Sequence, residues 1–488
     1  MFPSYVDAIL RHAAHDPLRP AIGTTSGVLS YGQLASAVAT AATRLRSLGV
    51  GPGNIAAMVV NNPVWHITLV CALHRVGAIS MTIGRNQSAI LDEIDFLLFD
   101  EDVDNAGPGS PIQVTPDWFS GKFDPDRLPW HNFERDALCR IALSSGTTGT
   151  PKLIAMGPEI IWHRLSTYLL RGRFGLSERV LCGPQLRSHF AFAISFAALF
   201  SGKMVCFSDS ASETLSISSY YGIDLAVISV HQLTELIETQ GRLRGGLNSL
   251  REVQAGGAKI SDQLFGKIRS AIPCPVLNSY ASTEAGTVAL GEIGLLRSLG
   301  PADSVGVLVP WANVDILNDD GAVRAVDSSG IIRVRAIGLA PEFETKTMRV
   351  VEPSDFTPGD IGYVTSQRLL CIEGRSAELI NVGGNKIAPE TLERYVGEVS
   401  GVKEAAVFAL DDNSDLPRIC VCVTIDGDFD QGEIYTHMAK RTRVVTPSIV
   451  RIIPEMPRND TGKIIYNALR ESILQDRPAT GRHQTAHS

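Results

Sequence analysis

The 488-residue chain predicts an α/β fold followed by a β-rich segment and a compact α+β segment. Three observations lead to this prediction. Apolar runs of strand length alternate with helical patterns up to about residue 300, short β-rich runs separated by turns follow residue 305, and both patterns mix after residue 378. Alternation of strands and helices favours a mainly parallel sheet that is covered by helices.

The N-terminal elements follow from apolar spacing. Residues 4–50 predict a helix, a short hairpin and a second helix, and the second helix, around residues 34–48, is Ala-rich with apolar residues at helical spacing. The continuous apolar run 55–60 comes after Gly-Pro-Gly and indicates a buried strand, and residues 64–76 predict the next helix.

The same alternation recurs further along the chain. Residues 203–207 and 225–230 predict strands on either side of a helix at 212–221. After about residue 305 the character changes, because Asp-Asp-Gly and Ser-Ser-Gly turns separate short β-rich runs. These runs predict a small antiparallel sheet or barrel and lie at residues 314–317, 322–326 and 331–336.

Composition and charge exclude several classes of protein. The chain has 44 Lys and Arg against 52 Asp and Glu, for a net charge of −8, and contains no basic run. A mildly acidic chain of this kind argues against a dedicated nucleic-acid binder. The apolar run 190–200 is too short to span a bilayer, which takes about 20 residues. No signal-peptide pattern opens the chain, so we expect a cytoplasmic protein without a membrane span.

The cysteines indicate buried free thiols and no metal centre. None of them forms a C-x-x-C pair, and two that lie two residues apart should face the same side of a strand. The eight are Cys71, Cys139, Cys182, Cys206, Cys274, Cys371, Cys420 and Cys422.

The strongest local signal is the stretch 143–152, Leu-Ser-Ser-Gly-Thr-Thr-Gly-Thr-Pro-Lys. Its glycines let backbone N–H groups converge, its hydroxyls add donors, and its lysine adds charge. Such a loop suits a polyphosphate, although it is not a Walker A loop and a plain surface turn is the alternative.

Three further motifs carry polar residues of the same kind. Asn-Ser-Tyr-Ala-Ser-Thr-Glu at 278–284 follows an apolar strand and offers an aromatic ring, a hydroxyl and a carboxylate suited to Mg²⁺. Gly-Asp-Ile-Gly at 359–362, with Gly-Arg at 374–375, suits a ribose or forms a surface ion pair. Pro-Arg-Asn-Asp-Thr-Gly-Lys at 457–463 places a lysine in an exposed loop.

In type, order and spacing the four motifs resemble the ANL superfamily, which comprises acyl- and aryl-CoA synthetases, adenylation domains and luciferases. The resemblance extends from about residue 5 to 470. It implies a large N-terminal domain of two α/β subdomains plus a small β-barrel (residues 1–377), a small mobile α+β C-terminal lid (378–474), and a disordered tail (475–488). The implied chemistry is ATP- and Mg²⁺-dependent formation of an acyl-adenylate with release of pyrophosphate, followed by transfer of the acyl group to a thiol, that of CoA.

The resemblance also implies roles for individual residues. Asn278 would read the adenine amino group, Tyr280 would stack on adenine, Thr283 would contact the α-phosphate and Glu284 would bind Mg²⁺. Lys463 would bridge the carboxylate and the α-phosphate. The remaining nucleotide contacts would be Ser144, Ser145, Gly146, Thr147, Thr148, Gly149, Lys152, Gly256, Gly257, Ala258, Asp360 and Arg375. The hinge would be Glu378, and the thiol tunnel would be lined by Gly383 and Gly384.

His189 matches the aromatic or histidine gate of acyl- and aryl-CoA ligases, where amino-acid adenylation domains usually carry an aspartate. Phe190, Gly256 and Ala281 would line the substrate pocket with it. No acid nearby could hold an amine, so we expect an uncharged acyl or aryl acid, although a purely structural His189 stays open. Leu153 after the loop lysine weakly favours aromatic acids, and Tyr466 stands where many relatives have an arginine.

Two alternatives to a CoA ligase stay open. The first hands the activated acyl group to a carrier-protein pantetheine, an amine or another nucleophile. The second is a catalytically silent nucleotide sensor or scaffold. The presence of the charged motif residues argues against it; these are Lys152, Glu284, Asp360, Arg375 and Lys463. A dehydrogenase and an α/β-hydrolase are poorly supported, because the sequence has neither G-x-G-x-x-G after a strand nor G-x-S-x-G. The sequence does not indicate the oligomeric state.

Overall fold

The computed structural model describes residues 4–84, 94–101, 109–121, 131–134, 137–144, 152–243, 246–301, 303–344, 349–351, 353–382, 385–410, 418–442, 445–458 and 462–475. The chain forms two compact units. The first comprises Met1–Asp315, Arg333–Pro358 and Val364–Cys371, and the second comprises Ile316–Ile332, Gly359–Tyr363 and Ile372–Ser488. The second unit thus contains the predicted C-terminal lid together with preceding segments, and the lid boundary at residue 378 stays a prediction.

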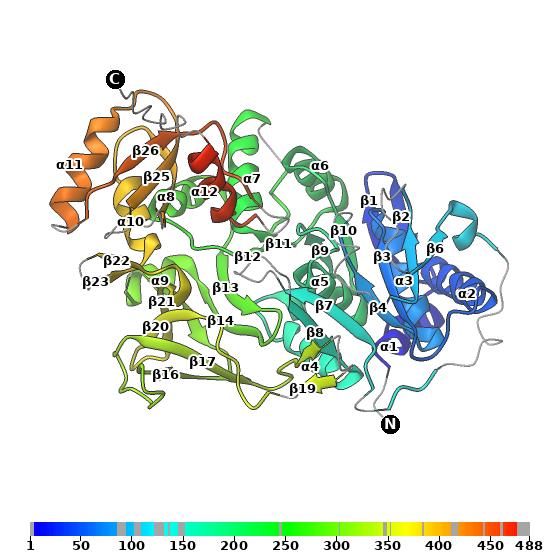
Figure 1. The fold of residues 1–488 in the computed structure, drawn as a ribbon. Coiled ribbons are helices and arrows are strands. Elements are labelled where there is room, and N and C mark those ends of the chain that lie inside the picture. The colour runs from blue at the N-terminus through cyan, green and yellow to red at the C-terminus, as the bar shows by residue number, and fades with distance from the viewer. Residues whose placement is uncertain are drawn as a thin grey trace, which may run out of the picture. The chain divides into compact units, whose positions relative to one another are not determined.

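A long mixed sheet forms the centre of the first unit. In hydrogen-bonding order it runs β21, β15, β14, β13, β12, β11, β9, β10, β1 and β2. Figure 1 shows β10, β9, β11, β12 and β13 side by side in this order, and these strands are parallel. The strands are β1 (Pro20–Thr24), β2 (Gly27–Ser30), β9 (Arg179–Cys182), β10 (Met204–Phe207), β11 (Leu225–Ser229), β12 (Glu252–Gly256), β13 (Val276–Ser282), β14 (Gly286–Glu292) and β15 (Ser304–Leu308).

The chain passes from one unit to the other within four strands, so each of these strands has residues in both units. They are β16 (Ala312–Leu317), β17 (Gly330–Ala336), β20 (Asp360–Val364) and β21 (Leu369–Arg375). The pairs β15–β21 and β17–β20 are antiparallel, as the turn-rich sequence predicts. The run 322–326 forms only an isolated bridge at Val323, so the expectation of a strand there is wrong. Val323 and Val326 are about 60% exposed and bury no apolar face that would hold a strand.

A second sheet of the first unit runs in the order β19, β18, β8, β7, β4, β3, β5 and β6. Its strands are β3 (Ile55–Val59), β4 (Ile79–Thr82), β5 (Phe96–Phe99), β6 (Ser110–Gln113), β7 (Arg140–Ser144), β8 (Lys152–Met156), β18 (Glu342–Glu344) and β19 (Arg349–Val351). The predicted run 55–60 is therefore a strand, and it is buried along its whole length.

Helices cover both faces of the long sheet. The helices of the first unit are α1 (Tyr5–His15), α2 (Tyr31–Ser47), α3 (Pro63–Val76), α4 (Pro158–Tyr168), α5 (His189–Phe200), α6 (Ala211–Tyr221), α7 (Val230–Leu243), α8 (Asp262–Ala271) and α9 (Ile293–Leu299), with the 3₁₀ turns η2 (Pro116–Phe119) and η4 (Phe174–Leu176). The bounds of α2, α3 and α6 agree with the predicted helices within a few residues. In α3, the Asn62 side chain accepts from two backbone N–H groups at the start, and left-handed Gly77 ends the helix.

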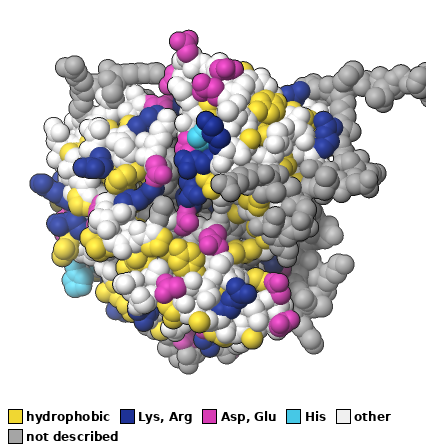
Figure 2. All heavy atoms as spheres, turned by 90° about the vertical axis from the view of Figure 1, so that its left-hand side faces the viewer, with side chains coloured by type: hydrophobic (Ala, Val, Ile, Leu, Met, Phe, Trp, Pro, Cys, Tyr) yellow, Lys and Arg dark blue, Asp and Glu magenta, His cyan; other side chains and the backbone are white. Residues whose placement is uncertain are grey.

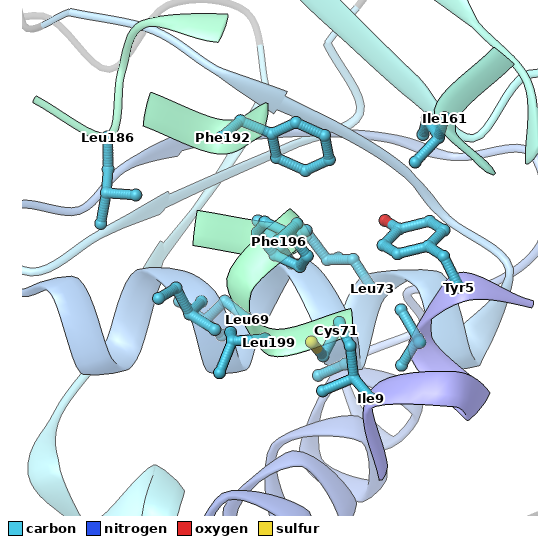
Figure 3. Close-up of a cluster of buried hydrophobic side chains, with 14 of the residues drawn as sticks. Tyr5, Ile9, Leu69, Cys71, Leu73, Ile161, Leu186, Phe192, Phe196 and Leu199 are labelled. Atoms are coloured by element: carbon cyan, nitrogen blue, oxygen red, sulfur yellow. The ribbon is translucent and has the colours of Figure 1, made fainter. Parts of the chain in front are cut away.

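Alternate residues of a central strand enter two different hydrophobic clusters. Leu225 and Val227 of β11 pack in the cluster that contains α1 to α5, whereas Ala226 and Ile228 pack with α6 to α8. A strand buried on both faces explains why its sequence is continuously apolar. Figure 3 shows Phe192 and Phe196 of α5 inside the first cluster beside Tyr5, whose ring centroid lies 5.8 Å from that of Phe196.

The second unit has a three-stranded sheet in the order β24, β25, β26. Its elements are β22 (Ile380–Val382), β23 (Asn385–Ile387), β24 (Val402–Leu410), β25 (Arg418–Ile425), β26 (Ile449–Ile452), α10 (Pro389–Gly397), α11 (Gln431–Thr442), α12 (Tyr466–Gln475) and the 3₁₀ turn η5 (Ser376–Glu378). Helices α10 and α11 cover one face of this sheet and α12 covers the other. The predicted disordered tail lies, apart from Gln475, outside the described residues.

The prediction of buried free thiols holds for seven of the eight cysteines. All eight cysteines are free and seven are buried, while Cys274 is partly exposed. Cys420 and Cys422 pack in the same cluster, on one side of β25. In the described part of the chain, no helix is both long enough and apolar enough to cross a membrane. On the face that Figure 2 shows, Lys and Arg side chains occur in several places among acidic and apolar ones.

Candidate active site

The two ends of the predicted phosphate loop lie side by side in the first unit. Strands β7 and β8 pair antiparallel, and Ser144 at the end of β7 faces Lys152 at the start of β8. The Lys152 Nζ atom lies 3.1 Å from the Glu342 carboxylate, and both side chains are about half-exposed. An ion pair this exposed is worth at most about 1 kcal/mol, so a phosphate can replace the carboxylate at little cost. The predicted contacts Ser145, Gly146, Thr147, Thr148 and Gly149 lie outside the described residues.

The predicted adenine and Mg²⁺ residues share the hairpin formed by β13 and β14. A register shift between Tyr280 and Ala281 forms a β-bulge, which bends the hairpin just before its turn. Asn278 is 9% exposed, and its Nδ2 group donates to the Val305 carbonyl over 2.7 Å. The amide oxygen of Asn278 is therefore the group left to accept from an amino group, as the predicted adenine contact requires.

A buried arginine holds the turn of this hairpin. Arg164 of α4 donates from Nη1 to the Thr283 carbonyl and from Nη2 to the Glu284 carbonyl, each over 2.5 Å, and both Nε and Nη2 donate to the Gly338 carbonyl. The Ala340 N–H group also donates to the Glu284 carbonyl, over 2.8 Å. Burial lowers the pKa of Arg164 to about 10, and the nearby Glu284 opposes that shift.

The side chains of the turn stay available while its backbone is held. Thr283 and Glu284 are both partly exposed. In the described part of the chain, no hydrogen bond engages the Thr283 hydroxyl or the Glu284 carboxylate. A partly exposed carboxylate with unoccupied oxygens is the donor that Mg²⁺ uses when it also keeps waters and substrate phosphates. No three His, Cys, Asp or Glu side chains among the described residues form a cage that would hold a metal without such a substrate.

His189 is joined to the same arginine. It is the first residue of α5, which the Ser188 hydroxyl caps by accepting from the Ala191 N–H group. Arg164 Nη1 lies 3.0 Å from His189 Nε2. A guanidinium can only donate, so Nε2 accepts and the neutral ring carries its hydrogen on Nδ1. Burial, then Arg164 and Arg140, hold the pKa of His189 well below its ordinary value.

The Nδ1 atom of His189 is buried and has no hydrogen-bond partner in the described structure. The ring stacks on Phe192 with a centroid distance of 5.7 Å. Through Arg164, the structure places the neutral imidazole of His189 near Thr283 and Glu284. The Nδ1–H group of this imidazole is a donor without a partner in the described structure.

The remaining predicted pocket residues lie at the ends of β12 and β13. A Cβ atom on Gly256 would lie 3.0 Å from the Ser279 carbonyl oxygen and 3.9 Å from Phe190 Cζ, so Gly256 and Phe190 are neighbours. Gly257 has φ of +91°, a turn conformation that favours glycine. Gly257, Ala258 and Ala281 are exposed.

In the second unit, Asp360 and Arg375 come together. Asp360 begins β20, Arg375 ends β21, and Arg375 Nε lies 3.3 Å from Asp360 Oδ1. Asp360 is buried and the predicted hinge residue Glu378 is partly buried. Gly383 and Gly384, which were predicted to line the thiol tunnel, lie outside the described residues.

Lys463 lies in a loop of the second unit, and hydrogen bonds join the two ends of this loop. Ile465 N–H donates to the Pro457 carbonyl over 2.8 Å, and Arg458 Nη1 donates to the Gly462 carbonyl over 2.8 Å. Arg458 also forms an ion pair with Glu404. Lys463 is partly exposed and follows Gly462, which has φ of +79°.

The motifs did not include Arg164, and the structure adds to what the sequence indicated for Leu153 and Tyr466. Arg164 falls on the apolar stripe of α4 with Ile161, Leu165 and Tyr168, and a charged residue at a core position is a signal that could have found it. Leu153 is buried in the core. Tyr466 donates from its hydroxyl to Glu393 Oε1 over 2.7 Å, so it serves the fold of the second unit.

Comparisons with known proteins identify the family of the chain. The family described as AMP-binding enzyme matches residues 9–343, and the family described as AMP-binding enzyme C-terminal domain matches residues 391–463. Indoleacetate–CoA ligase of Aromatoleum aromaticum is 25% identical and covers 95% of this chain and 97% of its own length.

Two solved structures share the fold. o-Succinylbenzoate–CoA synthetase of Bacillus subtilis, with an acyl-adenylate bound, superposes with a TM-score of 0.84 at 20% identity and covers 96% of this chain and 98% of its own. The amide bond synthetase of Marinactinospora thermotolerans superposes with a TM-score of 0.83 at 19% identity, with 96% and 99% covered. The predicted fold class is confirmed, and the chain belongs to the AMP-binding enzymes of the ANL, or adenylate-forming, superfamily.

Proposed function

We propose that the protein is an AMP-forming acid–thiol ligase, which activates a carboxylic acid with ATP and passes the acyl group to CoA. The observation that carries the proposal is the turn held by Arg164, which fixes the Thr283 and Glu284 backbone beside a neutral His189 and leaves both side chains of the turn available. We further propose that it works in the reducing cytoplasm, where its free cysteines stay reduced.

The first step brings two anions together, the carboxylate of the acid and the triphosphate of ATP. Mg²⁺ bound with ATP lowers the negative charge at the phosphate oxygens. Glu284 would hold that ion, Lys152 and the hydroxyl- and glycine-rich loop that precedes it would hold the outer phosphates, and Thr283 would contact the α-phosphate. Asn278 and Tyr280 would bind adenine, and Asp360 with Arg375 would bind the ribose end.

Lys463 would supply the last cation in this step. It would bridge the attacking carboxylate and the α-phosphate, where negative charge builds up in the transition state. Lys463 belongs to the second compact unit, whereas Thr283 and Glu284 belong to the first. A lysine on a separate unit can leave after adenylation and make room for the thiol, with Glu378 as the hinge and Gly383 and Gly384 along the thiol path.

The surroundings of His189 disfavour an amino acid as substrate. The charged side chains that act on His189 are Arg164 and Arg140, both cations, and no carboxylate contacts the ring in the described structure. An α-ammonium group would find like charges there and no partner. We therefore propose an acyl or aryl acid without an amino group beside its carboxylate.

A second candidate keeps the adenylation step and changes the acceptor to a carrier-protein pantetheine or an amine. The hydroxyl of Tyr466, at the position where many relatives have an arginine, is engaged by Glu393 and offers no cation to a CoA phosphate. One protein of the same fold is an amide bond synthetase.

A screen of pyrophosphate release over aryl, aliphatic and amino acids tests both candidates. The acid–thiol ligase should release pyrophosphate with aryl or aliphatic acids and form thioester when CoA is added. Pyrophosphate release without any CoA product would favour the second candidate. Release with amino acids alone would contradict the reading of His189, and no release with any acid would refute adenylation.

A further inference from the structure

A buried arginine beside the proposed acyl pocket has donors that nothing in the described structure uses. Arg171 follows α4 and is 1% exposed. Its Nη2 group donates to the Ser279 hydroxyl over 2.9 Å, and its guanidinium carbon lies 4.2 Å from the centre of the Tyr168 ring. Its Nε and Nη1 groups are buried and have no hydrogen-bond partner. Native proteins seldom bury such donors unless a ligand or another group completes them.

Arg171 lies one side chain away from residues already assigned to the pocket. Ser279, which it contacts, pairs with Gly256 across β12 and β13, and both residues face the same side of the sheet. A Cβ atom on Gly256 would meet the Ser279 carbonyl at 3.0 Å and Phe190 Cζ at 3.9 Å. The unused donors are therefore next to the wall that Gly256 and Phe190 form.

A neighbouring acid, Glu252, forms no ion pair with this arginine in the described structure. Glu252 is buried, and its carboxylate accepts from the Arg173 backbone N–H group at 3.0 and 3.2 Å and from Gln254 Nε2 at 2.8 Å. No contact within ion-pair distance joins Glu252 to Arg171 in the described structure. The carbonyl oxygen of Arg171 accepts from Gln254 Nε2 over 3.2 Å, which fixes the backbone that carries the guanidinium.

We propose that Arg171, together with the Ser279 hydroxyl, binds a second oxygen acceptor on the acid, at the end away from the reacting carboxylate. The substrate class is then a carboxylic acid that also carries a carboxylate or a ketone oxygen, which differs from the plain uncharged acid expected from the sequence. A guanidinium matches a carboxylate with two parallel hydrogen bonds and a ketone with one. This inference rests on the proposed adenylation and adds the specificity of the same site.

The test compares acids in matched sets that differ only at the far end, as a carboxylate, a methyl ketone or an ethyl group. For the wild-type protein we expect kcat/KM for pyrophosphate release to be at least about 30-fold higher with the best oxygen-bearing member than with the ethyl member, because a site built to hydrogen-bond rejects an analogue that lacks the partner. A preference for the carboxylate member would show that Arg171 binds an anionic group of the acid. A preference for the ketone member would show that it binds a neutral oxygen.

The variant Arg171→Met keeps the length of the side chain and removes its donors. We expect KM for the oxygen-bearing acid to rise about 100-fold while KM for ATP and kinetics with the ethyl member change less than threefold. Arg171→Lys should recover part of the preference, and Arg173→Met, which changes an exposed neighbour, should behave as wild type. Arg171→Gln serves in place of the methionine variant if that variant does not fold.

Calorimetric binding of the same acids without turnover provides an independent readout. The proposal would be overturned if Arg171→Met lost the same affinity for all members of a set, or if the wild-type protein showed no preference in either assay. Arg171 would then be a residue that only packs on Tyr168. If the acids bind with the predicted preference but none releases pyrophosphate, the proposed adenylation fails and the assignment of Arg171 stands.

Discussion

Replacing Arg164 by methionine should weaken both the fold and the reaction, because one side chain holds three parts of the first unit. The substitution removes the donors to the carbonyls of Thr283 and Gly338 and to His189 Nε2, while the Glu284 carbonyl keeps the Ala340 N–H group. A buried carbonyl left without a partner costs about 1–3 kcal/mol. The Thr283 and Gly338 carbonyls are partly buried and His189 Nε2 is buried, so the loss of these three acceptors' partner gives about 2–6 kcal/mol.

Part of this cost is offset in the variant. Burial lowers the pKa of Arg164 to about 10, so the native protein holds this cation against a desolvation cost that methionine does not have. We therefore expect the free energy of unfolding to fall by about 2–4 kcal/mol. A shift of about 1 Å in Thr283 and Glu284 should also lower kcat for pyrophosphate release about 100-fold.

Urea unfolding and pyrophosphate release measure the two effects separately. Arg164→Lys should lie between wild type and the methionine variant, because an ammonium can donate to some of the same oxygens. The pKa of His189, followed by NMR, should rise in Arg164→Met, since one of the cations that lower it is gone. A methionine variant within 1 kcal/mol of wild-type stability and within threefold of its kcat would refute the reasoning.

Three further predictions concern single side chains. His189→Ala should change the preference among acids or raise KM for the acid; unchanged kinetics across a panel would remove His189 from the pocket. Glu284→Gln should raise the Mg²⁺ concentration required for half-maximal pyrophosphate release by about tenfold or more, and an unchanged requirement would show that Glu284 does not hold the ion. Burial raises the pKa of Glu393 from 4.5 to about 8 in the folded protein, so its contribution to stability is complete below pH 4.5 and is lost as the pH rises through 8. Glu393→Gln should therefore flatten the fall in unfolding free energy between pH 5 and 8, measured by urea titration; an unaltered slope would show that Glu393 ionises normally.

The sequence predicted those site residues that sit at the ends of strands. Ser144 ends β7, Lys152 begins β8 and Thr283 directly follows β13, where runs of Ser, Thr and Gly replace the apolar residues of the strand and are visible as motifs. The buried strand at 55–60 was equally clear, because it is continuously apolar.

The apolar stripe of α4 could have marked Arg164 as a buried charge, but the roles of Arg164 and Arg171 could not be predicted from the sequence, for a physical reason. Arg164 acts through carbonyls about 120 residues further along the chain, and backbone acceptors leave no signature in the side chains. Arg171 is recognised by donors that lack partners, which only the folded chain reveals. The two valines of the run 322–326 misled the strand prediction there, since the folded chain leaves both about 60% exposed.

The most direct test of the account separates its two half-reactions in Lys463→Ala. The account predicts that this variant loses acid-dependent pyrophosphate release at least about 100-fold, yet converts a supplied acyl-adenylate and CoA to the thioester within a few-fold of the wild-type rate. Adenylation at the wild-type rate, or an equal loss in both half-reactions, would contradict the role of Lys463 as a cation that serves the first step only.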